Sequence, residues 1–447
     1  MAGNQNSTAQ AVSNLAANAG NISPLKMAWQ GDPTGFEGLT ETQLDSMTLD
    51  TTLVGTNIDA FSRVRTSEPG YRFDSQLTYA IDADLWDTST TGGSVAHSSA
   101  ERYALLTATA GAANKAILQG HYCAPYTAGR GQLGLVTFVM GATPGTGVER
   151  RVGLYDETLA TGIYLSQTAS ATSLVVAGGT TLGTQTVAQG SWNIDPLNGT
   201  GPSGVTLDLT KVQILVIQFQ ALYVGSVTIG FDIDGSIVPV HRFDHANEVA
   251  YPYILNANLP VHYSVRTSSA QGTMAAVCCS VISEGGESLF ALSGRDFTAN
   301  NAITPISVTT RRAVLTIRAK QTLNSINQTA VAIPIGVQVL AQTNGSLVEI
   351  VRNGTLGGAP AWTNVDTTYS IMEYDVAGTT VTGGEVVDSF YAPAGSGSTR
   401  GSATENLGKL VLAYSHLLAA GDTVSVVCTS LTGTSSVLAS IDWAEIR

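Results

Sequence analysis

The stretch Val205–His245 reads VTLDLTKVQILVIQFQALYVGSVTIGFDIDGSIVPVHRFDH and decides the fold. Val212–Phe219 is almost wholly apolar on both sides, which is typical of a strand buried on two faces. After a short connection, apolar and polar residues alternate with period two from Val227 to Ile233. This second pattern predicts a strand with one buried and one exposed face.

A tight turn and a third strand come directly after it. Asp234-Gly235 offers the two positive-φ positions of a two-residue hairpin turn. Ile237–Phe243 then returns along the second strand, and Pro239 suits the edge of a sheet because it cannot donate a ladder hydrogen bond. The whole stretch therefore predicts a three-stranded antiparallel meander.

The composition extends this pattern to the rest of the chain. Of the 447 residues, 43% are apolar, only 12% are charged, and 47 are glycine. Abundant Gly, Ser and Thr between short apolar runs predict many short strands joined by tight loops. Few surface charges favour a chain covered by neighbours in an assembly; the alternative is an ordinary β protein with Thr, Ser and Asn on its surface.

Charge and cysteine content limit the partners. The net charge is −13 without a basic run, so we expect no nucleic-acid binding. Neighbouring Cys278 and Cys279 should face opposite sides of a strand. The other two cysteines are Cys123 and Cys428, and the sequence contains no C-x-x-C motif. We expect reduced, buried thiols and assembly in the cytoplasm, with no cofactor. The N-terminus lacks the pattern of a secretion signal and no apolar run reaches membrane-spanning length, so we expect no membrane partner.

Residues 1–60 differ from the rest of the chain. They are rich in Ala, Asn, Gln and Ser, have at most a short helix around Gln10–Ala17, and carry scattered apolar residues without a period. Such a segment cannot bury enough surface to offset its ordering entropy, so we predict an extended arm that a partner chain holds. Docking on its own domain is the alternative. The predicted anchoring residues are Leu15, Ile22, Leu25, Met27, Trp29 and Phe36.

Residues 61–283 predict a first antiparallel β-sandwich of jelly-roll type, because many strand-like runs alternate with turn signals. The expected strands, besides the meander, are Arg63–Thr66, Tyr79–Ala83, Tyr103–Ala108, Ala116–Tyr122, Gln132–Met140, Arg150–Tyr155, Gly162–Leu165, Ser173–Val176, Val261–Val265 and Met274–Ile282.

Residues 284–447 predict a second sandwich, Ig-like or jelly-roll-like. Ile333, Ile335, Val337 and Val339 alternate with other residues, and Asn344-Gly345 is predicted to be a hairpin turn into Ser346–Val351. The chain ends on the apolar face of a final strand that includes Ile441 and Trp443. The fold class is therefore all-β: two antiparallel sandwiches preceded by an extended arm.

Two groups of side chains resemble metal sites without meeting their requirements. His241 and His245, with Glu248 nearby, have the spacing of a helical metal pair, but four strand residues span about 13 Å, too far for one ion. The aspartates of the second group lack the Gly and Glu of a calcium hand, so turn formation is their expected role. They are Asp82, Asp84, Asp87, Asp232 and Asp234.

Catalytic signals are weak. Glu284 and Glu287 flank Gly285-Gly286 and could be cast as a glycosidase pair, but closeness in sequence does not place two carboxylates across a groove. No nucleophile elbow, phosphate loop or dinucleotide fingerprint occurs. We therefore expect a structural protein that is not an enzyme.

Aromatic residues on strands leave two alternatives open. They can anchor a core or an interface, or they can include a platform on which sugars stack. The residues concerned are Trp86, Tyr122, Tyr126, Tyr164, Trp192, Tyr223, Tyr251 and Tyr253.

Several motifs resemble a family of tailed-bacteriophage virion proteins. They include RVRTSEPG from Arg63, SWNIDPLNGTGPSG from Ser191, FDHAN from Phe243 and ASIDWAEI from Ala439, and the resemblance covers most of residues 60–447. It implies a non-enzymatic structural component of a virion, in the tail, its fibres or the capsid surface, assembled as a symmetric homo-oligomer. The implied partners are copies of itself and other virion proteins of the capsid, portal, neck or tail.

The alternative function is host adhesion. The same fold would then bind a cell-surface glycan through exposed loops at Thr127–Arg130 or Ala392–Ala403. A depolymerising tail spike would be a third class, but it requires the short repeated rungs of a parallel β-helix, and the sequence has no such period.

Overall fold

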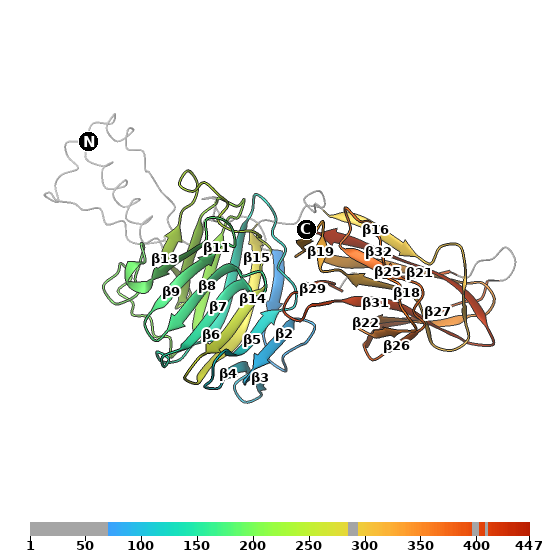
Figure 1. The fold of residues 1–447 in the computed structure, drawn as a ribbon, viewed down its shortest axis with the longest axis horizontal. Helices are drawn as coiled ribbons and strands as arrows, with labels where there is room; N and C mark the ends of the chain where they lie inside the picture. The colour runs from blue at the N-terminus through green and yellow to red at the C-terminus, as the bar shows by residue number, and fades with distance from the viewer. Residues whose placement is uncertain (1–69, 285–293, 396–401, 407–409) are drawn as a thin grey trace, which may run out of the picture. The chain divides into compact units, whose positions relative to one another are not determined.

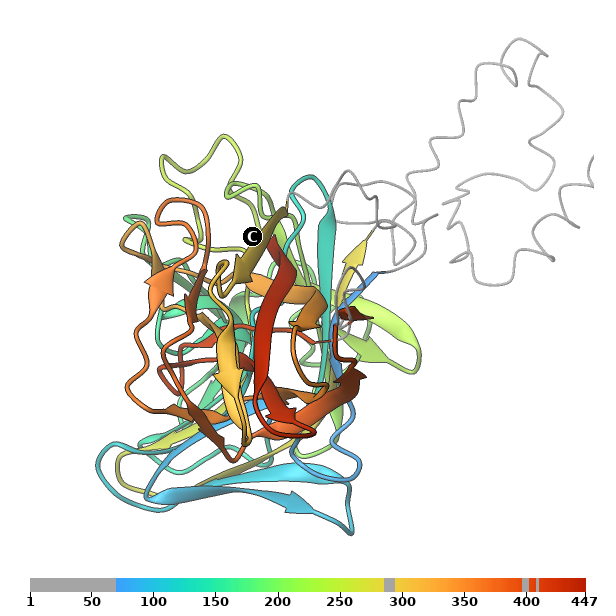
Figure 2. The same ribbon diagram turned by 90° about the vertical axis from the view of Figure 1, so that its right-hand side faces the viewer.

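The computed structural model describes residues 70–284, 294–395, 402–406 and 410–447, the side chains of 402–406 excepted. These residues belong to one compact unit, Val54–Arg447. Figure 1 shows that the described chain is built of β-sheets, and Figure 2 shows the same ribbon after a quarter turn, with the C-terminal strand in red. The prediction of an all-β fold with two antiparallel sandwiches is confirmed.

The first sandwich consists of an eight-stranded and a seven-stranded sheet. The strand order of the first sheet is β13 (Ser236–Phe243), β12 (Val227–Ile233), β11 (Gln213–Phe219), β6 (Gly131–Val139), β15 (Gly272–Glu284), β4 (Tyr103–Ala108) and β3 (Gly93–Ser98), with β1 (Gly70–Ser75) also paired to β15. The order of the second is β10 (Thr184–Ala188), β9 (Thr172–Ala177), β8 (Thr161–Thr168), β7 (Val148–Asp156), β14 (Val261–Thr267), β5 (Asn114–Gly120) and β2 (Trp86–Thr91). A 3-10 turn, η1 (Gln189–Ser191), comes after β10.

The second sandwich consists of a five-stranded and a six-stranded sheet. The strand order of the first is β16 (Arg295–Asn300), β32 (Ser435–Ile446), β21 (Val331–Ala341) and β28 (Ser402–Asn406), with β17 (Ile306–Val308) paired to β32. The order of the second is β24 (Thr363–Asn364), β25 (Met372–Asp375), β18 (Arg312–Ala319), β31 (Thr423–Ser430), β22 (Ser346–Arg352) and β27 (Glu385–Ala392). Three short hairpins complete it: β19 (Thr322–Leu323) with β20 (Ile326–Asn327), β23 (Thr355–Gly357) with β26 (Thr380–Thr382), and β29 (Tyr414–Ser415) with β30 (Ala420–Gly421).

The predicted meander is confirmed as β11, β12 and β13. β11 pairs antiparallel with β12, and β12 with β13. Asp234 and Gly235 have φ values of 53° and 80°, as a tight hairpin turn requires. Pro239 lies on β13, which forms the edge of its sheet. β11 also pairs with β6, so it lies inside the sheet and not at its edge. This position explains why β11 is buried.

Each sandwich has its own apolar core. Phe138, Leu154 and Tyr263 are fully buried in the first core, between its two sheets. In the second core, Ile441 and Trp443 of β32 are also fully buried, as the alternating pattern of that strand predicts. Burial of these large side chains is the main stabilising contribution to each sandwich.

Two local predictions are wrong. Tyr79–Ala83 is not a strand: it lies in a turn region where the Asp82 carboxylate accepts the backbone N–H of Asp84. Asn344-Gly345 does not close a hairpin, because β21 and β22 belong to different sheets and have no pairing with each other. That segment carries the chain from one layer of the sandwich to the other.

The predicted strand Arg63–Thr66 and the arm with its anchoring residues Leu15, Ile22, Leu25, Met27, Trp29 and Phe36 lie outside the described residues. Within the described part, no helix has the length and apolar character of a membrane span.

Candidate functional site

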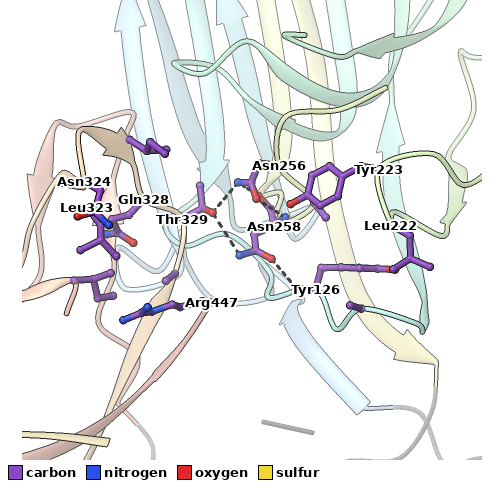
Figure 3. A pocket seen from close by; sticks show the side chains of 15 residues that line it. Tyr126, Leu222, Tyr223, Asn256, Asn258, Leu323, Asn324, Gln328, Thr329 and Arg447 are labelled. Carbon is purple, nitrogen blue, oxygen red and sulfur yellow. Dashed lines mark hydrogen bonds between the residues drawn. The ribbon is translucent and has the colours of Figure 1, made fainter. Parts of the chain in front are cut away.

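A pocket of about 530 Å³ lies where loops of the first sandwich meet the β19–β20 hairpin and the end of β32. Figure 3 shows Leu222 and Tyr223 on one side of it and Leu323, Asn324 and Gln328 on the other. Its size falls within the range of about 300–1,000 Å³ that is common for small-molecule sites. We call it the interdomain pocket.

Asparagines of the first sandwich fix the relative position of the pocket walls. The side-chain amides of Asn256 and Asn258 both donate to Oγ1 of Thr329, at 2.7 and 3.4 Å. Oδ1 of Asn258 accepts the backbone N–H of Tyr126 at 2.8 Å, and these bonds are among the dashed lines in Figure 3. The asparagines therefore serve mainly as supports for the pocket.

Two polar groups of the lining have atoms without a protein partner. Gln328 is only 7% exposed; its Nε2 donates to the Lys320 carbonyl, while Oε1 is buried and unpaired. Nε of Arg447 is also buried and unpaired, although its Nη2 donates to the fully buried Glu445 carboxylate at 3.2 Å. Buried polar atoms are normally hydrogen-bonded, so these two are exceptions within the lining of the pocket.

The rim of the pocket is apolar and half-exposed. Tyr223 is 42% exposed and Ile326 is 71% exposed. Tyr126 stacks on Phe219, with ring centroids 6.0 Å apart, and its hydroxyl accepts the N–H of Ala221. Burial raises the pKa of Tyr126, so its hydroxyl keeps its proton at neutral pH.

A second polar feature joins the two sandwiches. The His121 ring lies between two carboxylates, with Nδ1 2.8 Å from Asp87 and Nε2 2.9 Å from Asp422. Asp422 also accepts N–H groups from Asn353 and Ala413, and Arg352 reaches Asp84 at 2.7 Å. We call this group the carboxylate–histidine interlock.

The electrostatics of the interlock result from burial and pairing. Burial alone would lower the pKa of His121, but the hydrogen bonds and charges of Asp422 and Asp87 outweigh burial and raise it to about 10. Burial would raise the pKa of Asp422, yet the His121 hydrogen bond lowers it. The ring is therefore an imidazolium held between two carboxylates at neutral pH.

The interlock does not have the order of a nucleophilic triad. Ser415 Oγ contacts the carboxylate of Asp87, and the imidazole of His121 contacts that same carboxylate. A serine nucleophile requires the imidazole between the hydroxyl and the carboxylate. The arrangement therefore fits a structural link between domains.

The outer face of the seven-stranded sheet carries charged and aromatic residues. Arg151 pairs with Glu149 at 2.7 Å and lies over the rings of Tyr155 and Tyr164, 5.7 and 5.1 Å from their centroids. Burial would raise the pKa of Glu149, but the Arg151 hydrogen bond and charge outweigh it and lower the pKa. Both tyrosines are buried, so they offer no free platform.

The two histidines whose spacing resembles a metal pair have other partners. His241 Nδ1 accepts the N–H of Asn193, and His245 lies between the Gly225 carbonyl and Gln185. Burial lowers the pKa of both histidines. Among the described residues, no group of three or more His, Cys, Asp or Glu side chains is placed to hold a metal ion.

The aspartates divide between two roles. Asp232 accepts the N–H of Gly235 and shapes the hairpin turn, and Asp82 caps its own turn, as their expected role requires. Asp84 and Asp87 instead enter the interlock, which the sequence did not predict. Asp234 lies in the turn itself.

The remaining predicted residues are scattered. Glu284 ends β15, Glu287 lies outside the described residues, and the loop Thr127–Arg130 borders the interdomain pocket through Ala128. In the loop Ala392–Ala403, residues 396–401 are not described.

The predicted aromatic residues divide between core and surface. Trp86, Trp192 and Tyr253 belong to the first core, and Tyr122 packs against it. Tyr251 is 51% exposed, and Tyr126 and Tyr223 line the pocket. The core role is therefore confirmed for Trp86, Trp192 and Tyr253, and a sugar platform that includes Tyr126 and Tyr223 stays a prediction.

The thiols are distributed as their positions on strands imply. Cys123, Cys279 and Cys428 are buried and Cys278 is half-buried, and none of the four forms a disulfide. Cys279 lies in the first core, while Cys278 contacts Thr137.

Comparison with known proteins gives similarity in fold only. No protein-family model and no curated protein matches the chain. The Emp47p carbohydrate recognition domain is 11% identical and covers 49% of this chain and 98% of its own, with a TM-score of 0.29. The Bacillus licheniformis β-glucanase is 10% identical and covers 50% and 100%, with a TM-score of 0.31. A putative β-glucanase from Mycobacterium abscessus is 10% identical and covers 47% and 99%, with a TM-score of 0.33.

These similarities correct one expectation. The sequence predicted a protein that is not an enzyme, because stacked sheets without catalytic motifs suggested a purely structural role. Glucanases and other glycoside hydrolases are among the similar structures, alongside carbohydrate recognition domains. The sandwich architecture is thus shared by enzymes and binding proteins, and the expectation drawn from it is wrong.

Proposed function

We propose that this chain binds carbohydrate in the interdomain pocket. One observation carries the proposal: Gln328, whose buried Oε1 has no partner, lines the same pocket as the half-exposed ring of Tyr223. A sugar ring presents an apolar C–H face and a rim of hydroxyl groups. Such a ligand pairs the apolar rim of the pocket with its C–H face and gives Gln328 a hydroxyl donor.

The walls of the pocket are held in strained turns. Leu222 and Tyr223 have φ values of 34° and 63°, and Asn324 and Ser325 on the opposite hairpin have 51° and 64°. Positive φ is unfavourable for residues other than glycine, and such strain is concentrated at binding sites. The turns present the Tyr223 and Asn324 side chains to the pocket before a ligand arrives, which lowers the entropic cost of binding.

The lining favours a neutral sugar. Arg447 is the charged residue among those that line the pocket, and Glu445 pairs with it. A free carboxylate or sulfate on the ligand would therefore find little uncompensated positive charge. Hydroxyl groups can instead accept from the Arg447 guanidinium and donate to Gln328.

Replacing Tyr223 with alanine should weaken carbohydrate binding about tenfold, because the ring supplies much of the apolar contact at the rim. Calorimetry with maltotriose, mannotriose and chitotriose checks this. Tyr79→Ala is the matched control, since Tyr79 is 88% exposed and does not line the pocket. Absence of binding to the whole panel, or equal affinity in Tyr223→Ala and wild type, would refute the proposal.

The context of this binding is a second part of the proposal. The motifs at Arg63, Ser191, Phe243 and Ala439 resemble tailed-phage virion proteins. We infer that the chain is a component of a virion and that the glycan it binds lies on the host surface. The motif at Ser191 has a clear structural role: Asp195 accepts N–H groups from Leu197 and Ser203 and shapes its loop. The loop is therefore a scaffold element of the first sandwich.

Deletion of residues 1–25 tests the anchoring arm. The truncated protein should fold, as judged by circular dichroism, but fail to enter particles when expressed in place of the full chain during infection. The measurement is immunoblotting of purified particles, with the full chain as control. Normal incorporation of the truncated chain would contradict the anchoring role.

A further inference from the structure

The hydrogen bonds around Thr329 determine which groups of the interdomain pocket can donate to a ligand. Thr329 lines the pocket, lies between β20 and β21, and is half-buried. Its Oγ1 faces the side-chain amides of Asn256 and Asn258, as Figure 3 shows. The orientation of these two amides therefore decides whether the Thr329 hydroxyl accepts from them or donates to them.

Backbone N–H groups fix the orientation of both amides. The N–H of Tyr126 donates to Asn258 at 2.8 Å, and the N–H of Asn258 donates to Asn256 at 3.0 Å. A backbone N–H can only donate, so the side-chain atom that faces it must be the amide oxygen in each case. Asn256 and Asn258 consequently turn their Nδ2 groups toward Thr329, and both can only donate to it.

The Thr329 hydroxyl keeps a proton that these amides cannot accept. A hydroxyl group has two lone pairs and one proton, and here the two amide donors lie 2.7 and 3.4 Å from Oγ1. Within the described part of the chain, Thr329 Oγ1 is the acceptor in both of its hydrogen bonds and the donor in none. The group that Thr329 can offer to a ligand is therefore an O–H donor.

The neighbouring residue has the opposite polarity. Nε2 of Gln328 donates to the Lys320 carbonyl at 3.0 Å, which fixes this amide as well, and Oε1 can only accept. Ala257 and Ala330, both buried, add methyl groups to the same lining. Adjacent residues thus supply one donor and one acceptor of fixed polarity beside a small apolar surface.

We propose that the pocket selects sugars that carry an acetamido group, and that Thr329 determines this specificity. The inference rests on the proposed function of the pocket and narrows its ligand class. The acetamido carbonyl accepts the Thr329 proton, the acetamido N–H donates to Gln328, and the methyl group packs against Ala257 and Ala330.

A hydroxyl group in the same place is a poorer match. It can pair with Thr329 or with Gln328, but its single oxygen replaces three groups of the acetamido substituent, and it has no methyl group. A buried polar group of the protein that stays unpaired in the complex weakens binding. Sugars without the acetamido group should therefore bind less tightly.

Chitotriose and cellotriose are the matched ligands for the test. They share one backbone and linkage and differ only in the group on the second carbon of each ring, acetamido in chitotriose and hydroxyl in cellotriose. Wild type should bind chitotriose at least about tenfold more tightly, as measured by calorimetry.

Three variants assign the preference to the hydroxyl. Thr329→Val removes the donor and should weaken chitotriose binding about tenfold and cellotriose binding less, so that the selectivity shrinks. Thr329→Ser keeps the hydroxyl and should keep the wild-type selectivity. Thr298→Val is the control, because Thr298 is exposed on β16 and does not line the pocket.

The outcomes separate failure of this inference from failure of the proposed function. If no sugar binds, both fail. If chitotriose and cellotriose bind equally well, or if Thr329→Val weakens both by the same factor, the pocket still binds carbohydrate and only the selection of acetamido sugars is overturned. Loss of selectivity in Thr329→Ser would likewise overturn the role of the hydroxyl.

Discussion

Replacing Asp422 with alanine should lower the free energy of unfolding by about 3–5 kcal/mol, because removal of one partner of a buried ion pair leaves the other charge unpaired. Asp422 is 3% exposed and accepts from His121, Asn353 and Ala413. Arg352 lies 4.0 Å from the same carboxylate. The loss is a large fraction of the roughly 5–15 kcal/mol that stabilises a typical domain.

Urea unfolding followed by tryptophan fluorescence measures this effect. Asp244→Ala is the matched control: Asp244 pairs with Arg242 at 2.6 Å, but both side chains are about half exposed, so the expected cost is below about 1 kcal/mol. Asp422→Asn keeps an acceptor for the Ala413 N–H and should fall between the two. Equal costs for Asp422→Ala and Asp244→Ala would show that the interlock does not hold the sandwiches together.

The stability of the protein should decrease as pH rises from about 6.5 to about 10. The pKa of His121 is raised in the folded state from 6.5 to about 10, so its contribution is fully present below 6.5 and is lost as pH approaches 10. At about 1.4 kcal/mol per pKa unit, this difference corresponds to on the order of 5 kcal/mol. The lowered pKa of Asp422 results from the same ion pair, so it adds no separate contribution to the free energy of unfolding.

Comparison with His121→Gln isolates this contribution from other groups that titrate at high pH. Buried tyrosines also titrate in that direction: burial raises the pKa of Tyr122 to about 12, for example. Wild type should be more stable than His121→Gln near pH 6, and the gap should close as pH approaches 10. A gap that stays constant over this range would contradict an imidazolium at this position.

The candidate site could be predicted only in part. The sequence singled out Tyr126 and Tyr223 as a possible sugar platform and Thr127–Arg130 as a glycan loop, and these border the pocket. Gln328 and Arg447 carried no local signal. Their importance depends on which atoms lack partners after packing, and this property is absent from a pattern of residues.

The wrong and missing strand-level predictions have the same physical origin. Asn344-Gly345 is a common hairpin sequence, but the segments that it joins pair with different neighbours in different sheets. The Ser/Thr-rich strands β2 and β3 were not predicted, because Trp86–Thr91 and Gly93–Ser98 have no apolar alternation. Pairing with neighbouring strands decided both cases.

The sequence by itself determined the strands that carry their own pattern: the meander of β11–β13 and the alternating β32. Period-two burial and turn chemistry act over a few residues, so they can be seen without the fold. Only the tertiary structure decided the interlock and the pocket, because His121 and Asp422 are 301 residues apart, and Asn256 and Thr329 are 73 apart. Their contacts exist because the two sandwiches pack together and exclude water, and a local sequence pattern cannot predict this packing.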